Sequence, residues 1–330
     1  MIDWLRLIRV SGLATIASNT IASLAMFADG LSPTWMLARL KHGELRVLWV
    51  PLASFLLYAA GMLWNDLHDV ERDRVLNPRR PLPSGRVGLP AAYVVGVLLV
   101  VGALLAGYLA ESHIGFYAAG VVLSLALLYD FAAKSVPYVG SLVMGLVRSS
   151  HAIFVLLVLG PEYMQLALGI GHDPARQPWL LSYPLILGLY IFGVTLISEL
   201  ESRRARRWEL LVGGGVIALA LALSCARVVN AHWVVELGNR LHAAAPVAIA
   251  AVMAVGLTIL GILVVSIARP YLEALRTGKQ ALVGATVRAA LGGIILLDAL
   301  IAISGHPLAW LPIILLYPLF RAVGSLIRMD

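Results

Sequence analysis

The sequence predicts an all-α membrane protein, a polytopic bundle of nine or ten transmembrane helices. The chain has 330 residues, of which 60% are hydrophobic and 13% are charged, and its mean hydropathy is +0.89. Soluble domains have about 45–50% apolar and about 25% charged residues, so this composition excludes a soluble fold. The sequence contains long uninterrupted apolar segments, whereas the strands of a transmembrane barrel would alternate apolar and polar residues.

Ten apolar blocks are each long enough to cross the hydrocarbon core as a helix, which takes about 20 residues. They lie near 8–27, 47–64, 90–110, 113–130, 138–160, 179–198, 209–227, 245–268, 284–303 and 307–327. Only AESH separates the third block from the fourth, so we expect a tight hairpin there. The first block is too long for a cleaved signal peptide, and we interpret it as the first transmembrane helix.

The distribution of positive charge predicts the orientation of the bundle. The net charge is +7, and most Lys and Arg residues fall in loops that share a side with the N-terminus. Because cytoplasmic loops are enriched in Lys and Arg, both termini are expected in the cytoplasm. A basic balance of this origin gives no reason to expect a nucleic-acid partner. The single cysteine, Cys225, excludes an intrachain disulfide.

Three polar clusters follow the second, fourth and sixth apolar blocks, all on this cytoplasmic side. The first is WNDLHDVERDRVLNPRRPLPSGR at 64–86, the second is YDFAAK at 129–134, and the third is SELESRRARR at 198–207. Functional sites of helical bundles are built from side chains on facing helices. We therefore expect the three clusters to converge on a single polar chamber.

The first cluster has the pattern of a magnesium site. Asp66, Asp69 and Asp73 recur at helical spacing, so a continuous helix would stack the three carboxylates on one face. Stacked carboxylates repel unless a divalent cation lies among them, and oxygen ligands favour Mg²⁺, which shares its coordination with substrate phosphates. Asn65 adds an amide oxygen. A solvated loop would explain the nearby arginines but not the three acids.

Arginines beside these acids indicate an anionic substrate. Arg79 and Arg80 lie in NPRRPLPSG, where Pro and Gly favour a folded loop over a helix, and Arg72 lies among the acids. Guanidinium groups bind phosphate oxygens in bidentate fashion. A loop of this kind next to a carboxylate and metal cluster suits a diphosphate.

Seven further polar residues are candidates for contact with the substrate. Tyr129 and Lys134 belong to the second cluster, and Arg148 lies inside the fifth span, where a charge is costly and usually functional. Asn19 in the first span is expected to line the same cavity, with a hydrogen bond between helices as the alternative. Ser149, Ser150 and His151 follow Arg148 and have the same two interpretations.

These motifs resemble the UbiA superfamily of intramembrane prenyltransferases. NDLHDVERD at 65–73 matches the family motif N-D-x-x-D-x-x-x-D, NPRRPLPSGR at 77–86 matches its downstream loop, and YDFAAK is similar to its Tyr-x-x-x-x-Lys element. The resemblance implies a single domain over 1–330, a helical bundle around a central cavity with a cytoplasmic polar cap.

The resemblance also implies a chemistry, the Mg²⁺-dependent transfer of a prenyl group from an isoprenyl diphosphate to a lipophilic, often aromatic acceptor. Carried over by position, the residues that would hold Mg²⁺ and diphosphate are Asn65, Asp66, Asp69 and Asp73. Those that would stabilise the leaving diphosphate are Arg80, Tyr129 and Lys134. We expect the catalytic residues to be Asp66, Asp69, Tyr129 and Lys134.

The third cluster departs from the family, which usually carries a second motif, D-x-x-D-x-x-x-D. With Glu199 at the first position, neither later position is acidic, and Glu201 would face away from Glu199 on a helix. Three interpretations stay open. Arg203 or Arg204 replaces the charge of a second metal, or the protein has lost catalysis and kept binding, or Glu199 and Arg203 form a surface i, i+4 pair.

The leading prediction is therefore a prenyltransferase in the lipid bilayer. The C-terminal TVRAALGGIILLDALIAISG and the additional span resemble the EboC-like branch of the superfamily, which favours a bacterial inner membrane. The alternative is a catalytically altered relative that binds or translocates an isoprenoid or another lipophilic metabolite. An unrelated transporter is disfavoured, since no Gly- or Pro-broken spans repeat between the two halves. The acceptor, the prenyl length and the oligomeric state stay open.

Overall fold

The computed structural model describes residues 2–26, 46–158, 181–201, 206–231, 234 and 245–326, and the described residues contain helices and no β-strand. The longer helices are α2 (Leu13–Ala25), α4 (Arg46–His68), α6 (Leu89–Phe131), α7 (Val139–Val158), α10 (Ser182–Ser198), α11 (Arg207–Val229), α13 (Ala245–Thr277) and α14 (Gln280–Gly305). The shorter elements are α1 (Ile2–Leu7), η1 (Val10–Gly12), α5 (Val70–Leu76), η2 (Ala133–Ser135), η3 (Glu199–Glu201), α15 (Trp310–Ile314) and α16 (Leu316–Leu326). The predicted all-α fold is confirmed for this part of the chain.

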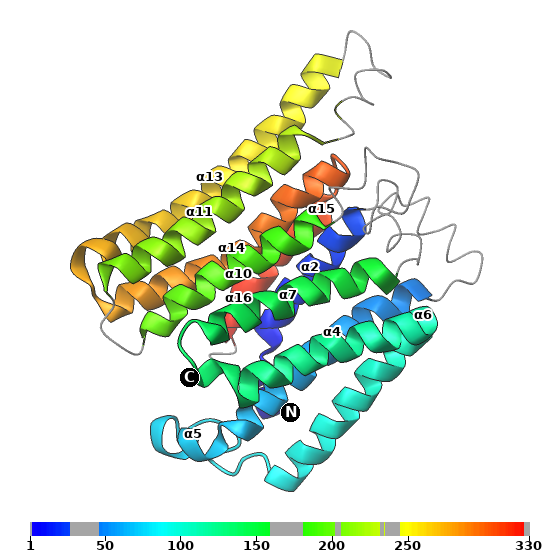
Figure 1. The fold of residues 1–330 in the computed structure, drawn as a ribbon, viewed down its shortest axis with the longest axis vertical. Helices are drawn as coiled ribbons and strands as arrows, with labels where there is room; N and C mark the ends of the chain where they lie inside the picture. Colours follow the sequence, from blue (N-terminus) through cyan, green and yellow to red (C-terminus); the bar gives the residue numbers. More distant parts are fainter. Residues whose placement is uncertain are drawn as a thin grey trace.

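Seven of the described helices are long and apolar enough to cross a membrane, fewer than the nine or ten predicted. One reason is that α6 counts once although it reverses direction at Glu111 and Ser112, where the backbone leaves the helical region (Figure 1). The hairpin predicted there is confirmed. The other reason is that the first and last predicted segments hold the shorter apolar helices Val10–Ala25 and Trp310–Gly324.

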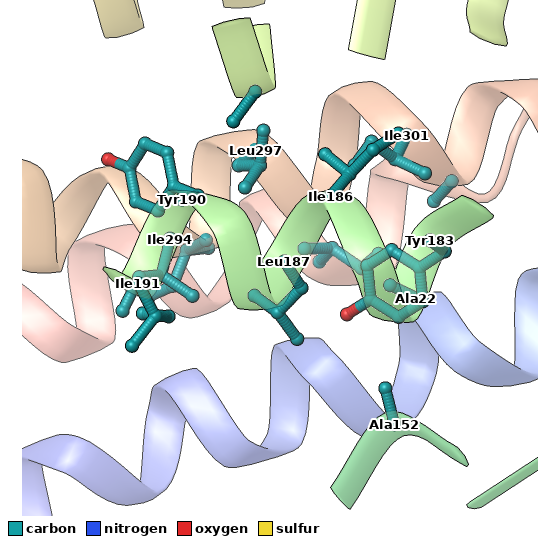
Figure 2. Packing of buried hydrophobic residues seen from close by; sticks show 14 of the residues in the cluster. Ala22, Ala152, Tyr183, Ile186, Leu187, Tyr190, Ile191, Ile294, Leu297 and Ile301 are labelled. Carbon is teal, nitrogen blue, oxygen red and sulfur yellow. The ribbon is translucent and has the colours of Figure 1, made fainter. Parts of the chain in front are cut away.

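Helix α10 forms the centre of the hydrophobic core. Its side chains Tyr183, Leu187 and Tyr190 are fully buried, and Figure 2 shows them close to Leu297 of α14 and Ala22 of α2. The neighbours of α10 also include α7 and α11. The Tyr190 hydroxyl donates to the Ala290 carbonyl oxygen at 2.8 Å, so this polar group is satisfied inside the apolar core.

The C-terminal helices complete the bundle instead of extending it. Helix α14 packs against α2, α10, α11 and α13, and 83% of its most apolar segment is buried inside the protein. Figure 1 shows α11 and α13 running side by side on one flank, with the α6 hairpin on the opposite flank. The N-terminal helix α2 therefore receives contacts from the C-terminal part of the chain.

The loop predicted after the first polar cluster is confirmed. After α5 the chain makes a series of turns from Asn77 to Val87, and Gly85 adopts a φ of 74°, in the left-handed region that favours glycine. Leu82 and Val87 are buried in a small cluster with Leu67 of α4. These two apolar anchors hold the loop against the end of α4, next to the polar residues of the first cluster.

Candidate functional site

A cavity of about 620 Å³ lies between α2, α4, α6, α7 and α10. Its polar lining consists of Arg9, Ser54, Tyr58, Asn65, Asp69, Arg72, Arg80, Tyr129, Asp130, Lys134, Arg148, His151, Thr195, Ser198, Glu199 and Glu201. Its apolar lining consists of Ile16, Leu57, Gly61, Met62, Val122, Ala126, Met144 and Val147. All three polar clusters contribute side chains, so the predicted convergence on one chamber is confirmed.

Asp69 and Lys134 join the first polar cluster to the second. Asp69 lies between α4 and α5, and Lys134 lies in η2, directly after α6. The Lys134 Nζ atom donates to Asp69 Oδ2 at 2.8 Å and to Asn65 Oδ1 at 3.0 Å. The Lys134 and Asp69 side chains are each 17% exposed, so solvent screens this pair less than a surface pair. Asn65, Asp69 and Lys134 thus form one polar group in the cavity wall.

Asp66 lies beside Arg9, a residue that no local motif marks as part of a site. The buried Asp66 carboxylate accepts hydrogen bonds from Arg9 Nη2 and Asn65 Nδ2, both at 3.4 Å. Arg9 has a φ of 47°, a left-handed conformation that breaks the chain between α1 and η1. Because 57 residues separate Arg9 from Asp66, spacing within either segment gives no sign of the contact.

Asp73 anchors the loop that follows α5. Its buried carboxylate accepts from Arg80 Nη1 at 2.5 Å and from Asn77 Nδ2 at 2.8 Å. Arg80 lines the cavity, whereas Asp73 lies behind it. Of the other two predicted basic residues, Arg72 lines the cavity and Arg79 is exposed outside it. Asp73 therefore acts here by positioning Arg80.

The predicted stacking of Asp66, Asp69 and Asp73 on one helix is met only in part. Backbone hydrogen bonds run from Asp69 N to Asn65 O at 3.0 Å and from Asp73 N to Asp69 O at 2.8 Å. The helix is nevertheless interrupted at Asp69, between α4 and α5, and each carboxylate lies against a different cation. Within the described ranges, no three Asp, Glu, His or Cys side chains form a group that could hold a metal ion.

The oxygen atoms around Asp69 still suit a hard cation, if substrate oxygens supply part of its coordination. Mg²⁺ prefers oxygen ligands and is usually held by one or two carboxylates, with waters and substrate phosphates completing its shell. Asn65 and Asp69 line the cavity, and Asp66 is hydrogen-bonded to Asn65. These oxygens are too few to enclose a metal ion, but they fit one that phosphate oxygens also bind.

Tyr129 and Asp130 lie at the end of α6 and line the cavity. Tyr129 is a predicted site residue. Asp130 is an additional buried carboxylate that corresponds to no predicted motif position. Its only sequence signal is its place beside Tyr129 in YDFAAK, one residue from a residue already expected in the site.

Glu199 of the third cluster is held firmly at the cavity wall. Its carboxylate accepts from Tyr138 N at 3.1 and 3.2 Å and from Ser141 Oγ at 2.5 Å. Glu201 lines the cavity as well, but its carboxylate lies beside Gly284 and Arg288 of α14, whereas Glu199 is held by α7, as expected for two residues that face apart. Both residues lie in the 3-10 turn η3. Arg203, with its predicted role, lies outside the described residues.

Arg148 lines the cavity from α7 and is held there by α2. Its Nη1 donates to Asn19 Oδ1 at 3.1 Å, and its Nη2 donates to Thr15 Oγ1 at 3.5 Å. Asn19 is fully buried and does not line the cavity, so its predicted contact with substrate is replaced by the alternative, a hydrogen bond between helices. Asn19 acts on the cavity through Arg148.

A fully buried carboxyl group, that of Asp298 of α14, lies behind Asn19 and Arg148. The fully buried Asp298 carboxylate accepts from Ser18 Oγ and Asn19 Nδ2, both at 2.6 Å, and from the Tyr183 hydroxyl at 2.9 Å. Asn19 therefore bridges Asp298 and Arg148. This network joins α2, α7, α10 and α14, and its four helices come from distant parts of the sequence.

The arrangement is chemically suited to a substrate with an anionic end and an apolar body. Arg9, Arg72, Arg80 and Lys134 supply positive charge at one part of the cavity. Such groups neutralise phosphoryl oxygens, and Arg does so through two parallel hydrogen bonds. The remainder of the lining includes apolar side chains such as Leu57, Val122 and Met144, which suit an apolar body.

Several known proteins are similar to this chain in sequence. The model of the UbiA prenyltransferase family matches residues 17–212. Polyprenyl transferase ausN of Emericella nidulans is 28% identical over 171 residues, covering 51% of this chain and 47% of that protein. Digeranylgeranylglyceryl phosphate synthase of Methanobrevibacter smithii is 29% identical over 118 residues, covering 34% and 42%. The chain spans somewhat less than half the length of these curated relatives.

A solved structure reported for digeranylgeranylglyceryl phosphate synthase in membranes is similar over 88% of this chain and 97% of that one, with a TM-score of 0.53. At 18% identity this likeness shows the fold alone. The family model, by contrast, covers more than half of the chain and contains all three polar clusters. The protein with this acid- and arginine-lined chamber belongs to the UbiA prenyltransferase family.

Proposed function

We propose that this protein is a Mg²⁺-dependent intramembrane prenyltransferase, which moves a prenyl group from an isoprenyl diphosphate to a lipophilic, aromatic acceptor. The observation that carries the proposal is the meeting of Asn65, Asp69 and Lys134 in the wall of a cavity that Arg9 and Arg80 also line. Relatives named polyprenyl transferase and digeranylgeranylglyceryl phosphate synthase support the same class of reaction.

The diphosphate is bound at the polar end of the chamber. Lys134 and Arg80 supply hydrogen-bond donors to its oxygens, and Arg72 adds positive charge. Asp69 and Asp66 are the carboxylates that would hold Mg²⁺ together with the substrate oxygens. When bound, Mg²⁺ supplies Lewis-acid neutralisation of charge on the leaving group.

The reaction breaks the bond between the allylic carbon and the diphosphate oxygen, and the electron pair leaves with the diphosphate. Fixed positive groups stabilise the charge that develops on this oxygen, Lys134 and Arg80 among them. The acceptor then forms a bond to the allylic cation and releases a proton. Leu57, Val122 and Met144 line the cavity, and apolar walls of this kind keep water away from the cation.

The polar end of the chamber is assigned to the cytoplasm, with both termini on that side. The loop at 79–86 beside it contains three arginines, and such loops concentrate on the cytoplasmic face of membrane proteins. An inner membrane of a bacterium is the location that we propose.

The test is diphosphate release from the purified full chain in detergent, with geranyl, farnesyl and geranylgeranyl diphosphates and a panel of aromatic acceptors. We expect release that stops on removal of Mg²⁺ by EDTA, returns on adding Mg²⁺, and falls at least about 100-fold in Asp69→Asn. Release that is unaffected by EDTA, or equal in wild type and Asp69→Asn, would contradict the proposal.

A second candidate function, binding or transport of an isoprenoid without catalysis, is favoured by one observation. The Glu199 carboxylate is occupied by Tyr138 N–H and the Ser141 hydroxyl, at the position where a second acidic motif would hold a second cation. Saturable binding of the prenyl diphosphate, without release across the whole acceptor panel, would establish this function in place of the enzyme.

A further inference from the structure

Four carboxylate groups of the described residues line the chamber, those of Asp69, Asp130, Glu199 and Glu201. Three of the four have partners in the protein. Lys134 donates to Asp69, groups at the N-terminal end of α7 donate to Glu199, and the Ser198 hydroxyl donates to Glu201. The Asp130 carboxylate differs, because within the described part of the chain it makes no hydrogen bond and no ion pair.

Burial makes this lack of a partner unfavourable for Asp130, which is 4% exposed. Native proteins pair their buried carboxylates, hydrogen-bond them or place them on a metal ion. The charges of Asp69 and Asp66 add repulsion at Asp130, and those of Lys134 and Arg9 offset part of it without contacting the carboxylate. Because Asp130 lines the chamber, a cation bound in the chamber can supply the missing contact.

Asp130 and Asp69 come from neighbouring segments of the bundle. Phe131 and His68, which adjoin them in the sequence, contact each other edge to face with ring centroids 4.8 Å apart. The ends of α6 and α4 therefore lie side by side, and both carboxylates line the same chamber. In the free protein the charge of Lys134 acts on both, through a 2.8 Å hydrogen bond to Asp69 and at longer range on Asp130. The protein itself thus places positive charge next to this pair of acids.

We propose that Asp130 is a ligand of the Mg²⁺ that Asp69 holds, so that both carboxylates and the diphosphate share one cation. This inference rests on the proposed function, because it assigns a further residue to the metal ion of that function. Mg²⁺ is usually bound by one or two carboxylates, with phosphate oxygens and waters completing its shell. Asp130 supplies the second chamber-lining carboxylate from α6, outside the acidic stretch of the first cluster. The cation in turn gives the buried Asp130 the contact that it lacks in the free protein.

The experiment measures Mn²⁺ binding to the full chain in detergent by electron paramagnetic resonance, with inorganic pyrophosphate and without prenyl substrate or acceptor. Mn²⁺ takes the same oxygen ligands as Mg²⁺. Asp130→Asn is expected to lower Mn²⁺ affinity at least about ten-fold, the effect of removing one charged ligand. The substitution keeps the shape of the side chain and removes a buried charge, so the metal-free variant should unfold at the same midpoint as wild type or a higher one. The rise in midpoint that Mn²⁺ and pyrophosphate produce in wild type should be smaller in Asp130→Asn.

Asp130→Cys separates a metal ligand from a charge that acts at a distance. Thiolate ligands favour soft ions, so Cd²⁺ should displace Mn²⁺ from Asp130→Cys at least about ten-fold more effectively than from wild type. The matched control is Glu71→Gln, which removes an exposed carboxylate that is paired with Arg74 outside the chamber, and its Mn²⁺ affinity should equal that of wild type. Mn²⁺ affinity in Asp130→Asn within about two-fold of wild type, or an unchanged response of Asp130→Cys to Cd²⁺, would overturn the assignment of Asp130.

The outcome is separable from that of the proposed function. If Mn²⁺ affinity depends on Asp130 while no prenyl diphosphate releases diphosphate, the metal ligand stands and the enzyme assignment fails. If release depends on Mg²⁺ and Asp69 while Asp130→Asn binds Mn²⁺ as wild type does, the enzyme assignment stands and the metal ligand fails.

Discussion

The Lys134 ammonium lies 2.8 Å from the Asp69 carboxylate, although 65 residues separate the two in the sequence. The contact ties the turn after α6 to the break between α4 and α5, at the wall of the chamber. In the free protein Asp69 compensates the charge of Lys134. Under the proposed function, a bound diphosphate with a cation on Asp69 would take over that compensation, and the same lysine would serve the empty and the loaded site.

The first prediction concerns Lys134→Met. Removal of a positive charge that stabilises the leaving diphosphate should lower the rate of diphosphate release about 100- to 1,000-fold, with a smaller loss in Lys134→Arg. The control is Lys279→Met, which removes an exposed lysine before α14, outside the chamber. A rate for Lys134→Met within three-fold of wild type would show that this lysine has no role in the reaction.

The second prediction concerns Asp73→Asn, which breaks the ion pair with Arg80. The Asp73 side chain is 6% exposed and that of Arg80 is 31% exposed, so the lost pair is partly screened and should cost about 2 kcal/mol of unfolding free energy. Because Asp73 positions Arg80, the KM for the prenyl diphosphate should also rise.

The control for Asp73→Asn lies on the same short helix. Glu71 and Arg74 form an ion pair with side chains 75% and 49% exposed, and exposed pairs of this kind contribute little. Glu71→Gln should therefore leave both the unfolding midpoint and KM unchanged. Equal effects of the two substitutions, measured by denaturation in detergent and by initial rates, would remove the positioning role of Asp73.

The sequence predicted those parts of the site whose signal is local. Asp66 and Asp69 are three residues apart, a spacing that places both side chains on one face of a helix. Arg80 lies in a segment rich in Pro and Gly, which predicts a loop. The AESH hairpin was predictable for the same reason, because a short polar break between two long apolar runs leaves no other geometry.

Contacts between distant segments could not be predicted in this way. Asp298 lies 280 residues from Ser18, and its neighbours in the sequence are apolar, so nothing local indicates which helix it meets. For Asn19, the sequence shows only a polar residue within an apolar span. That observation fits a side chain that lines the cavity and one that forms a hydrogen bond between helices equally well. Which of the two applies depends on how α2, α7 and α14 pack, and that is a property of the whole bundle.

The third prediction concerns Asp298→Ala. The substitution removes the acceptor for Ser18, Asn19 and Tyr183 inside the core and leaves three buried donors unsatisfied, so it should cost about 3–5 kcal/mol of unfolding free energy. The measurement is the unfolding midpoint in detergent, followed by tryptophan fluorescence.

The control for Asp298→Ala is a buried polar residue on the same helix. The Ser304 hydroxyl donates to the Ile301 carbonyl oxygen at 2.7 Å and lies 4.0 Å from Met26 Sδ, so Ser304→Ala removes one hydroxyl hydrogen-bond donor and should cost about 1 kcal/mol. If Asp298→Ala were no more destabilising than Ser304→Ala, the network would contribute nothing beyond a single hydrogen bond.

The α6 hairpin depends on the close approach of two glycines. A Cβ atom added to Gly107 would lie 2.7 Å from the Gly115 carbonyl oxygen, and one added to Gly115 would overlap the Gly107 carbonyl oxygen. Both obstacles are backbone atoms, which cannot rotate away as a side chain would. Small residues at such contacts let membrane helices pack closely and gain van der Waals contact.

The last prediction is therefore a pair of identical substitutions with opposite results. Gly115→Ala should destabilise the protein by about 1–3 kcal/mol, because the two arms of the hairpin must separate to admit the methyl group. In Gly120→Ala the new methyl group meets only Leu104 Cδ2, at 4.0 Å, so the change should be neutral or stabilise the helix by up to about 1 kcal/mol. Both are measured as unfolding midpoints in the same detergent. Equal midpoints for the two variants would mean that the arms of α6 do not meet at Gly107 and Gly115.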